Sequence, residues 1–180
     1  MPGKLIYLMG PSGSGKDSVL QAAEERLRAN GCRIARRVIT RAAESTGEDA
    51  SGVTGEEFAR LDEEGAFALR WHANGLSYGI PRQIDDWLAE GQHVLVNGSR
   101  EYLPIARRRY PELIAVLLLV QPAILRQRLL ARGRETITQI DARLARNADF
   151  AELDDGCVTI DNSGALDDAV TKLVDLVVQA

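Results

Sequence analysis

The stretch that decides the fold is Gly10-Pro11-Ser12-Gly13-Ser14-Gly15-Lys16, followed by Asp17 and Ser18. It fits the pattern G-x-x-x-x-G-K, which needs a strand before it and a helix after it. The apolar run 5–9 precedes it, and apolar residues at helical spacing follow over 16–30. Glycines let the backbone curl so that several N–H groups point at one phosphate, and the helix dipole adds positive charge. This context predicts a phosphate-binding loop rather than a glycine-rich turn without a ligand.

The motif also indicates which ligands the loop binds. We expect residues 10–18 to bind ATP, with Lys16 as the mobile cation at its β- and γ-phosphates. The next position normally holds Ser or Thr, whose hydroxyl binds Mg²⁺, but here it holds Asp17. A carboxylate is a good magnesium ligand, so we interpret Asp17 as holding the ion directly or through water. The alternative is that Asp17 only caps the helix.

Apolar runs further along the chain predict four more strands, at 33–39, 94–97, 113–120 and 158–160. Helices are expected between them, near 101–109, from Pro122, after a capping box at Thr136 and over 165–178. This alternation predicts an α/β P-loop NTPase, with a parallel five-stranded sheet and helices on both faces. The glycine-rich stretch 40–80 interrupts it, and we expect an insertion with a helix near 56–64 and a hairpin from 67 to 78. The chain is then one domain, 1–180, with its core at 1–39 and 81–180.

Composition limits the partners that this protein can have. The net charge of −4 over 180 residues gives no support for nucleic-acid binding. Cys32 and Cys157 show neither metal-ligand spacing nor a disulfide framework, and the first apolar run is too short to span a membrane. We therefore expect a cytoplasmic protein whose partners are small molecules, with no nucleic acid and no membrane. A homodimer is compatible with the sequence.

Several motifs together resemble the guanylate kinase branch of the nucleoside monophosphate kinases. They are residues 10–16, Ile39-Thr40-Arg41, Tyr78-Gly79 and the arginines after Leu129. The resemblance covers nearly the whole chain and implies an acceptor-binding insertion at 40–80 and a lid near 132–136.

The same resemblance suggests roles for individual residues. Arg132 and Arg143 would close over the transferring phosphate as catalytic residues. Arg41 would clamp an acceptor phosphate and Tyr78 would contact it; a surface arginine and a half-buried hairpin tyrosine are the alternatives. The loop with Asn162 would border the adenine, or else cap a helix.

The acceptor site departs from guanylate kinases. Alignment on Tyr78-Gly79 puts Leu69 where they carry a glutamate that reads guanine, and 94–99 lacks their acidic pattern. A purine would be poorly selected by such a site. What stands there closely resembles the ribose 1,5-bisphosphate phosphokinases of bacterial phosphonate breakdown. The motifs are Gly15-Lys16-Asp17-Ser18, Val38-Ile39-Thr40-Arg41, Trp71-His72-Ala73-Asn74-Gly75, Tyr78-Gly79-Ile80, Val96-Asn97-Gly98-Ser99-Arg100 and 125–135.

This second resemblance implies that ATP phosphorylates ribose 1,5-bisphosphate to 5-phosphoribosyl 1-diphosphate (PRPP). The acceptor oxygen is already anionic, so the reaction needs positioning and charge neutralisation rather than a base. Asn97, Ser99 and Arg100 follow a central strand, where ligands bind in open parallel sheets. We expect Asn97 and Ser99 near the ribose hydroxyls and Arg100 near a phosphate, with helix capping by Ser99 as the competing interpretation.

Other interpretations stay open from the sequence. One is a guanylate or other nucleoside monophosphate kinase, and another is a non-catalytic, guanylate-kinase-like binding module; a gluconate or shikimate kinase is weaker. Arg128 is interpreted as a solvated helix charge. Arg107, Arg108 and Arg109 are interpreted as cations that suit the C-terminal end of a helix.

Overall fold

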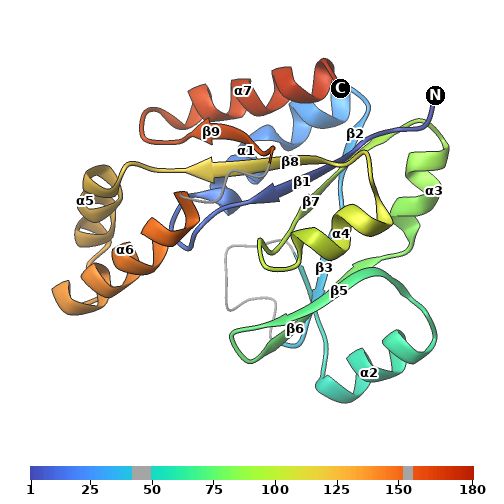
Figure 1. Ribbon diagram of the computed structural model, residues 1–180, viewed down its shortest axis with the longest axis horizontal. Coiled ribbons are helices and arrows are strands. Elements are labelled where there is room, and N and C mark those ends of the chain that lie inside the picture. Colours follow the sequence, from blue (N-terminus) through green and yellow to red (C-terminus); the bar gives the residue numbers. More distant parts are fainter. Residues whose placement is uncertain (42–49, 152–155) are drawn as a thin grey trace.

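The computed structural model describes residues 1–41, 50–151 and 156–180. Its core is a five-stranded sheet in the order β2-β7-β1-β8-β9, with every neighbouring pair parallel (Figure 1). The strands are β1 (Leu5–Met9), β2 (Cys32–Ile34), β7 (His93–Asn97), β8 (Ile114–Leu119) and β9 (Val158–Asp161). The predicted α/β class and the parallel five-stranded sheet are confirmed.

Strand β1 shows why both faces of this sheet are covered. Its five residues are all buried, and successive side chains enter different cores: Tyr7 packs in one cluster and Ile6 in the other. A strand with two apolar faces needs a layer on each side. The covering helices are α1 (Lys16–Ala29) and α7 (Leu166–Val178) on the Ile6 face, and α3 (Gln83–Ala89) and α4 (Leu103–Arg109) on the Tyr7 face (Figure 1).

A second sheet carries the insertion, in the order β4-β3-β6-β5. It consists of β3 (Arg37–Ile39), β4 (Ala50–Gly52), β5 (Phe67–Ala73) and β6 (Leu76–Pro81), with α2 (Gly55–Glu63) before the hairpin. The prediction of one strand over 33–39 was wrong. Ala35 N still donates to Leu95 O at 2.9 Å, but the charged pair Arg36 and Arg37 then leaves the buried sheet and starts the second one. Residues 42–49 of the expected insertion lie outside the described residues.

Two helices, α5 (Pro122–Arg132) and α6 (Ile137–Ala151), project beyond the carboxyl end of β8 (Figure 1). They pack on each other around Leu125, Leu129 and Ile140. The capping box expected at Thr136 is confirmed, since Gln139 N donates to Thr136 Oγ1 at 3.2 Å and Thr136 N donates to Gln139 Oε1 at 2.9 Å. Within the described ranges, no helix is long and apolar enough to cross a membrane.

Candidate active site

The phosphate loop, residues 10–16, joins the carboxyl end of β1 to the start of α1. Gly15 has φ of +88°, and a Cβ added there would lie 2.7 Å from Asn162 Nδ2, so only glycine fits. Asn162 is 4% exposed, and its Nδ2 donates to Ser14 O at 2.8 Å. The β9–α7 connection therefore supports the loop through Asn162. The residues of the loop also line a cleft.

One cleft of about 1450 Å³ joins the phosphate loop to the second sheet. Its walls contain nearly all the residues that the sequence indicated: 10–18, predicted for ATP; Arg41, Tyr78, Asn97, Ser99 and Arg100, predicted for the acceptor; and Arg132 and Arg143, predicted to close over the transferring phosphate. We call these three groups the donor, acceptor and lid sides of the cleft. These residues come from distant parts of the chain, and the structure brings them around one space. Their individual roles stay predictions.

On the acceptor side of the cleft, two aromatic rings and a guanidinium group are stacked on one another. The rings of Trp71 and Tyr78 are stacked, with centroids 5.5 Å apart and an angle of 8° between their planes, and the Arg37 guanidinium lies 4.8 Å from the Tyr78 ring centroid. Arg37 Nη1 also donates to Asn97 O at 3.3 Å. A cation that rests on an aromatic face and binds a carbonyl keeps a fixed orientation. Arg37 thus ties the second sheet to the end of β7 and brings a positive charge to the acceptor wall.

Asn97, at the end of β7, carries a buried polar atom for which the described residues offer no hydrogen-bond partner. The residue is 4% exposed and lines the cleft, and within the described part of the chain its Oδ1 accepts no hydrogen bond. A buried acceptor without a donor is costly, so this atom fits a ligand that brings a hydroxyl or N–H group.

The turn after Asn97 is held by a buried tyrosine. Tyr7 donates its hydroxyl hydrogen to Ser99 O at 2.7 Å, and its ring fills the space that a Cβ at Gly98 would need. Burial raises the pKa of Tyr7, so the hydroxyl keeps the proton that it donates. Ser99 and Arg100 are therefore presented to the cleft by a rigid support.

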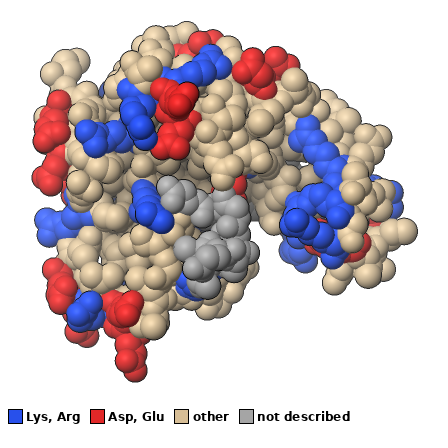
Figure 2. Space-filling view, turned by 180° about the vertical axis from the view of Figure 1, so that it is seen from behind, with Lys and Arg blue, Asp and Glu red and all other residues tan. Residues whose placement is uncertain are grey.

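The lid side supplies further cations. Figure 2 shows lysine and arginine side chains gathered on the lobe of α5 and α6, beside a hollow. Arg143 reaches across from α6, and its Nη1 donates to Ser12 Oγ at 2.6 Å. Arg132 ends α5 with an exposed side chain on the same cleft. Helix α6 thus brings one arginine into contact with the phosphate loop, and α5 brings a second to the same cleft.

Curated proteins with similar sequences match this chain over nearly its full length, including the residues that line the cleft. The chain is 66% identical over 175 residues to a protein of Pseudomonas paraeruginosa named ribose 1,5-bisphosphate phosphokinase PhnN, covering 97% of this chain and 95% of that protein. A protein of Thiobacillus denitrificans with the same name is 49% identical, covering 99% of this chain and 94% of its own length. The chain belongs to the ribose 1,5-bisphosphate phosphokinase family. No family model matches the chain.

Solved structures with a similar fold were also found for this family member. A guanylate kinase from Anaplasma phagocytophilum superposes with a TM-score of 0.67 at 20% identity, covering 98% of this chain and 85% of that one. A gluconokinase from Sinorhizobium meliloti superposes with a TM-score of 0.55 at 22% identity, covering 99% and 93% of the two chains. At these identities the comparison shows the fold alone, and it confirms the guanylate-kinase-like P-loop architecture.

Two cleft residues of this family member were missed by sequence reasoning. Arg37 was counted as part of a core strand, and Arg107 as a cation at a helix end, yet both line the cleft. Arg37 comes four residues before Arg41 in the sequence, and this nearness to a predicted acceptor residue is the signal that could have indicated it. No local signal distinguishes Arg107 from Arg109, which instead binds Asp85 at 2.9 Å on the surface.

The structure also shows how two residues beside the phosphate loop are held, and one of them differs from expectation. Arg128 is half-buried instead of solvated: it donates to Asn162 O at 2.8 Å and to Gly164 O at 3.1 Å. Asn162 itself lies beneath the phosphate loop and not among the residues that line the cleft. Both side chains thus help to fix the β9–α7 connection, and the predicted place of Asn162 beside the adenine stays a prediction.

Proposed function

We propose that this chain transfers the γ-phosphate of ATP to the 1-phosphate of ribose 1,5-bisphosphate and so forms PRPP and ADP. The observation that carries the proposal is the character of the acceptor wall. Leu69, at the position of the guanine-reading glutamate in guanylate kinases, is 2% exposed and packs in the core instead of lining the cleft. Arginines, an amide and a hydroxyl line the cleft instead, which suits a sugar bisphosphate without a base. The names of the relatives support the same acceptor.

The reaction needs no general base, because the attacking phosphate oxygen is already anionic. An oxygen of the 1-phosphate attacks the γ-phosphorus, the bond from that phosphorus to the β–γ bridging oxygen breaks, and ADP leaves with the electron pair. We propose that Lys16, Arg132 and Arg143 neutralise the negative charge on the transferring phosphoryl group. Arg41 and Tyr78 are assigned to the phosphate that attacks. Because both substrates are anions, the protein contributes positive charge and alignment.

The sugar hydroxyls are assigned to the turn after β7. We assign one ribose hydroxyl to the Oδ1 of Asn97, which accepts no hydrogen bond among the described residues, and a second to Ser99; both residues line the cleft. A hydroxyl that donates to Asn97 would satisfy the buried atom, which a purely apolar ligand could not do. Arg100 and Arg37 lie on the same wall and are assigned to the phosphates of the acceptor.

Magnesium fits the donor side. Asp17 lies in the first turn of α1, after the N-cap Gly15, and lines the cleft beside Lys16. One carboxylate next to a triphosphate is a donor set typical of Mg²⁺, with phosphate oxygens and waters supplying the other ligands. When bound, the ion supplies neutralising charge to the phosphates. Cys32 and Cys157 are free thiols, in keeping with a reducing cytoplasm as the place of this reaction.

Phosphorus NMR tests the acceptor and the reaction together. The purified protein with MgATP receives ribose 1,5-bisphosphate in one tube and GMP in another. The expected result is the diphosphate signals of PRPP in the first tube only. Turnover of GMP alone would mean that the chain is a divergent nucleotide kinase. Tight MgATP binding without turnover of either acceptor would favour a binding module.

A further inference from the structure

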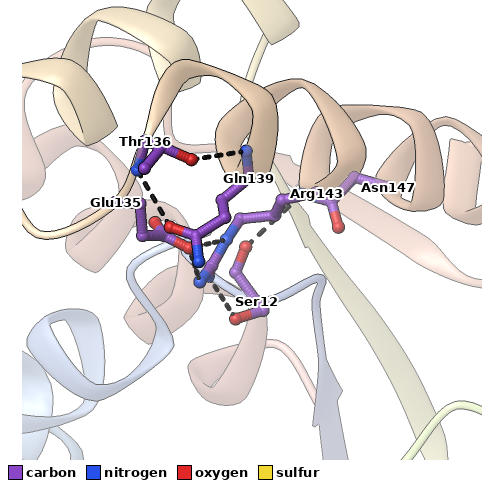
Figure 3. A network of polar contacts seen from close by, with 6 residues as sticks. All are labelled: Ser12, Glu135, Thr136, Gln139, Arg143 and Asn147. Atoms are coloured by element: carbon purple, nitrogen blue, oxygen red, sulfur yellow. Dashed lines mark hydrogen bonds and ion pairs between the residues drawn. The ribbon is translucent and has the colours of Figure 1, made fainter.

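The side chain that reaches the phosphate loop from the lid is held by a carboxylate. Arg143 donates from Nε and from Nη2 to Glu135 Oε1, at 3.1 and 2.5 Å, and from Nη1 to Ser12 Oγ at 2.6 Å (Figure 3). A second residue of the same helix face, Asn147, donates from Nδ2 to Ser12 O at 3.4 Å. The tip of the phosphate loop is thus contacted by two α6 side chains, and one of them is oriented by Glu135.

A carboxylate in this position needs an explanation. In the proposed function it lies beside the place where ATP and a sugar bisphosphate meet, and both are anions, so its charge opposes their binding. The pair is partly buried, with 22% of the Glu135 side chain and 21% of the Arg143 side chain exposed, so its geometry is less screened than that of a surface pair. Glu135 accepts from one edge of the guanidinium, which fixes the plane of the group. The remaining N–H groups of Arg143 can then meet a phosphate in a set orientation.

The backbone around Glu135 is fixed as well. Thr136, the next residue, forms the capping box with Gln139 that starts α6 (Figure 3). On the other side, α5 ends at Gly133 with φ of 65°. Two residues remain between that helix end and the cap, so Glu135 has little freedom to move away from Arg143.

We propose that Glu135 is a positioning residue for phosphoryl transfer, which orients the Arg143 guanidinium over the phosphate loop toward the γ-phosphate of ATP. This inference rests on the proposed function, because it takes Arg143 as a group that meets the transferring phosphate. Glu135 acts through Arg143 and touches neither substrate.

The same two helices offer a matched control. Arg126 on α5 and Asp141 on α6 form an ion pair at 3.3 Å, with 42% and 56% of their side chains exposed. This pair also joins α5 to α6, but its residues do not line the cleft. Asp141→Asn therefore removes an arginine–carboxylate contact of the lid without touching the phosphate loop.

A double-mutant cycle on PRPP formation tests the proposal. Glu135→Ala should lower kcat by about tenfold to a hundredfold, the range for a misplaced catalytic group. Glu135→Gln should recover part of this loss, since its amide oxygen can accept from the same N–H groups. In the Arg143→Ala background, Glu135→Ala should cause no further loss, and Asp141→Asn should leave kcat unchanged. Equal losses in both backgrounds, or no loss in Glu135→Ala, would overturn the proposal.

A binding measurement separates this inference from the proposed function. The ratio of the Kd for ADP to the Kd for the β,γ-imido analogue of ATP reports what the γ-phosphate adds to binding, and it needs no acceptor. Glu135→Ala should lower this ratio in the wild-type background and leave it unchanged in the Arg143→Ala background. If the wild-type protein forms no PRPP, the proposed function fails and this ratio decides the role of Glu135. An unchanged ratio in every folded variant would then contradict it.

Discussion

The two walls of the cleft are built in different ways. The donor wall is one contiguous segment, residues 10–18, whose cradle is made of backbone and is fixed from below by Asn162. The acceptor wall is made of side chains from several elements, among them Arg37 on β3, Tyr78 on β6 and Asn97 on β7. One wall depends on local sequence, and the other exists only once the chain is folded.

This difference predicts where selectivity for the acceptor arises. A backbone cradle recognises phosphate whatever molecule carries it, because its N–H groups contact the phosphate alone. With the proposed assignment of the two walls, we expect the side chains of the acceptor wall to select the acceptor. Changes to the donor wall should lower turnover whatever the acceptor, whereas changes to the acceptor wall should affect one substrate alone.

The largest effect is expected at Lys16 in the donor wall. Lys16→Met removes the cation at the transferring phosphate and should lower kcat by about 100- to 1000-fold, as does removal of other groups that stabilise transition-state charge. The KM for the acceptor should change little. A coupled assay of ADP release measures both constants. Lys172→Met, at an exposed position of α7, is the control and should retain full activity. A loss below tenfold in Lys16→Met would show that the cradle works through its backbone alone.

The second effect belongs to the acceptor wall. Arg37→Met keeps an apolar side chain over Tyr78 but removes the charge, so the KM for ribose 1,5-bisphosphate should rise about tenfold to a hundredfold, as for a lost charge-assisted hydrogen bond. The KM for ATP should stay the same. Arg33→Met is a matched control, because Arg33 also stacks on a ring, 4.9 Å from the Trp87 centroid, but lies outside the cleft. Equal rises in the KM for ribose 1,5-bisphosphate and the KM for ATP would contradict the assignment of separate donor and acceptor walls.

The same contrast explains what could be predicted from the sequence. Residues 10–18 were identified because their pattern, the strand before them and the helix after them are all local. The buried strand β8 was identified because a run of apolar residues has few other structures open to it. Each of these features depends on neighbours in the chain.

What was missed depends on distant contacts. The turn between Ile34 and Arg37 is set by which sheet each residue joins, since Ala35 N bonds to Leu95 O of the core sheet while Arg37 pairs with Ala50 in the second sheet. Helix α3 was not predicted at all, although Ile84 is fully buried in it. Seven residues offer too short a periodic pattern to stand out in a sequence. Glu135 belongs to the stretch 125–135 that carries the family resemblance, but nothing in the sequence indicated its role, because a carboxylate that orients an arginine eight residues away resembles any surface charge.

A smaller effect is expected at Asp17, on the metal side of the donor wall. Asp17→Ala should raise the Mg²⁺ concentration needed for half-maximal activity by several-fold, because one carboxylate ligand is lost. Asp17→Ser restores the hydroxyl usual at this position and should bring the requirement back toward that of the wild type. A magnesium titration at fixed ATP measures both. An unchanged titration in Asp17→Ala would leave helix stabilisation as the role of this residue.

The smallest effect compares two helix caps on opposite sides of the cleft. Thr54 caps α2 beside the acceptor hairpin and Thr136 caps α6 on the lid, each through a capping box. Replacing either by Ala should cost about 0.5–2 kcal/mol of stability, or about 2–4 °C in Tm for each kcal/mol. Only Thr136→Ala should also lower kcat, because Thr136 fixes the backbone next to Glu135. Thermal melts and steady-state rates on both variants give the comparison. If Thr136→Ala lowers Tm and leaves kcat intact, Glu135 and Ser12 suffice to orient Arg143 without a rigid helix start.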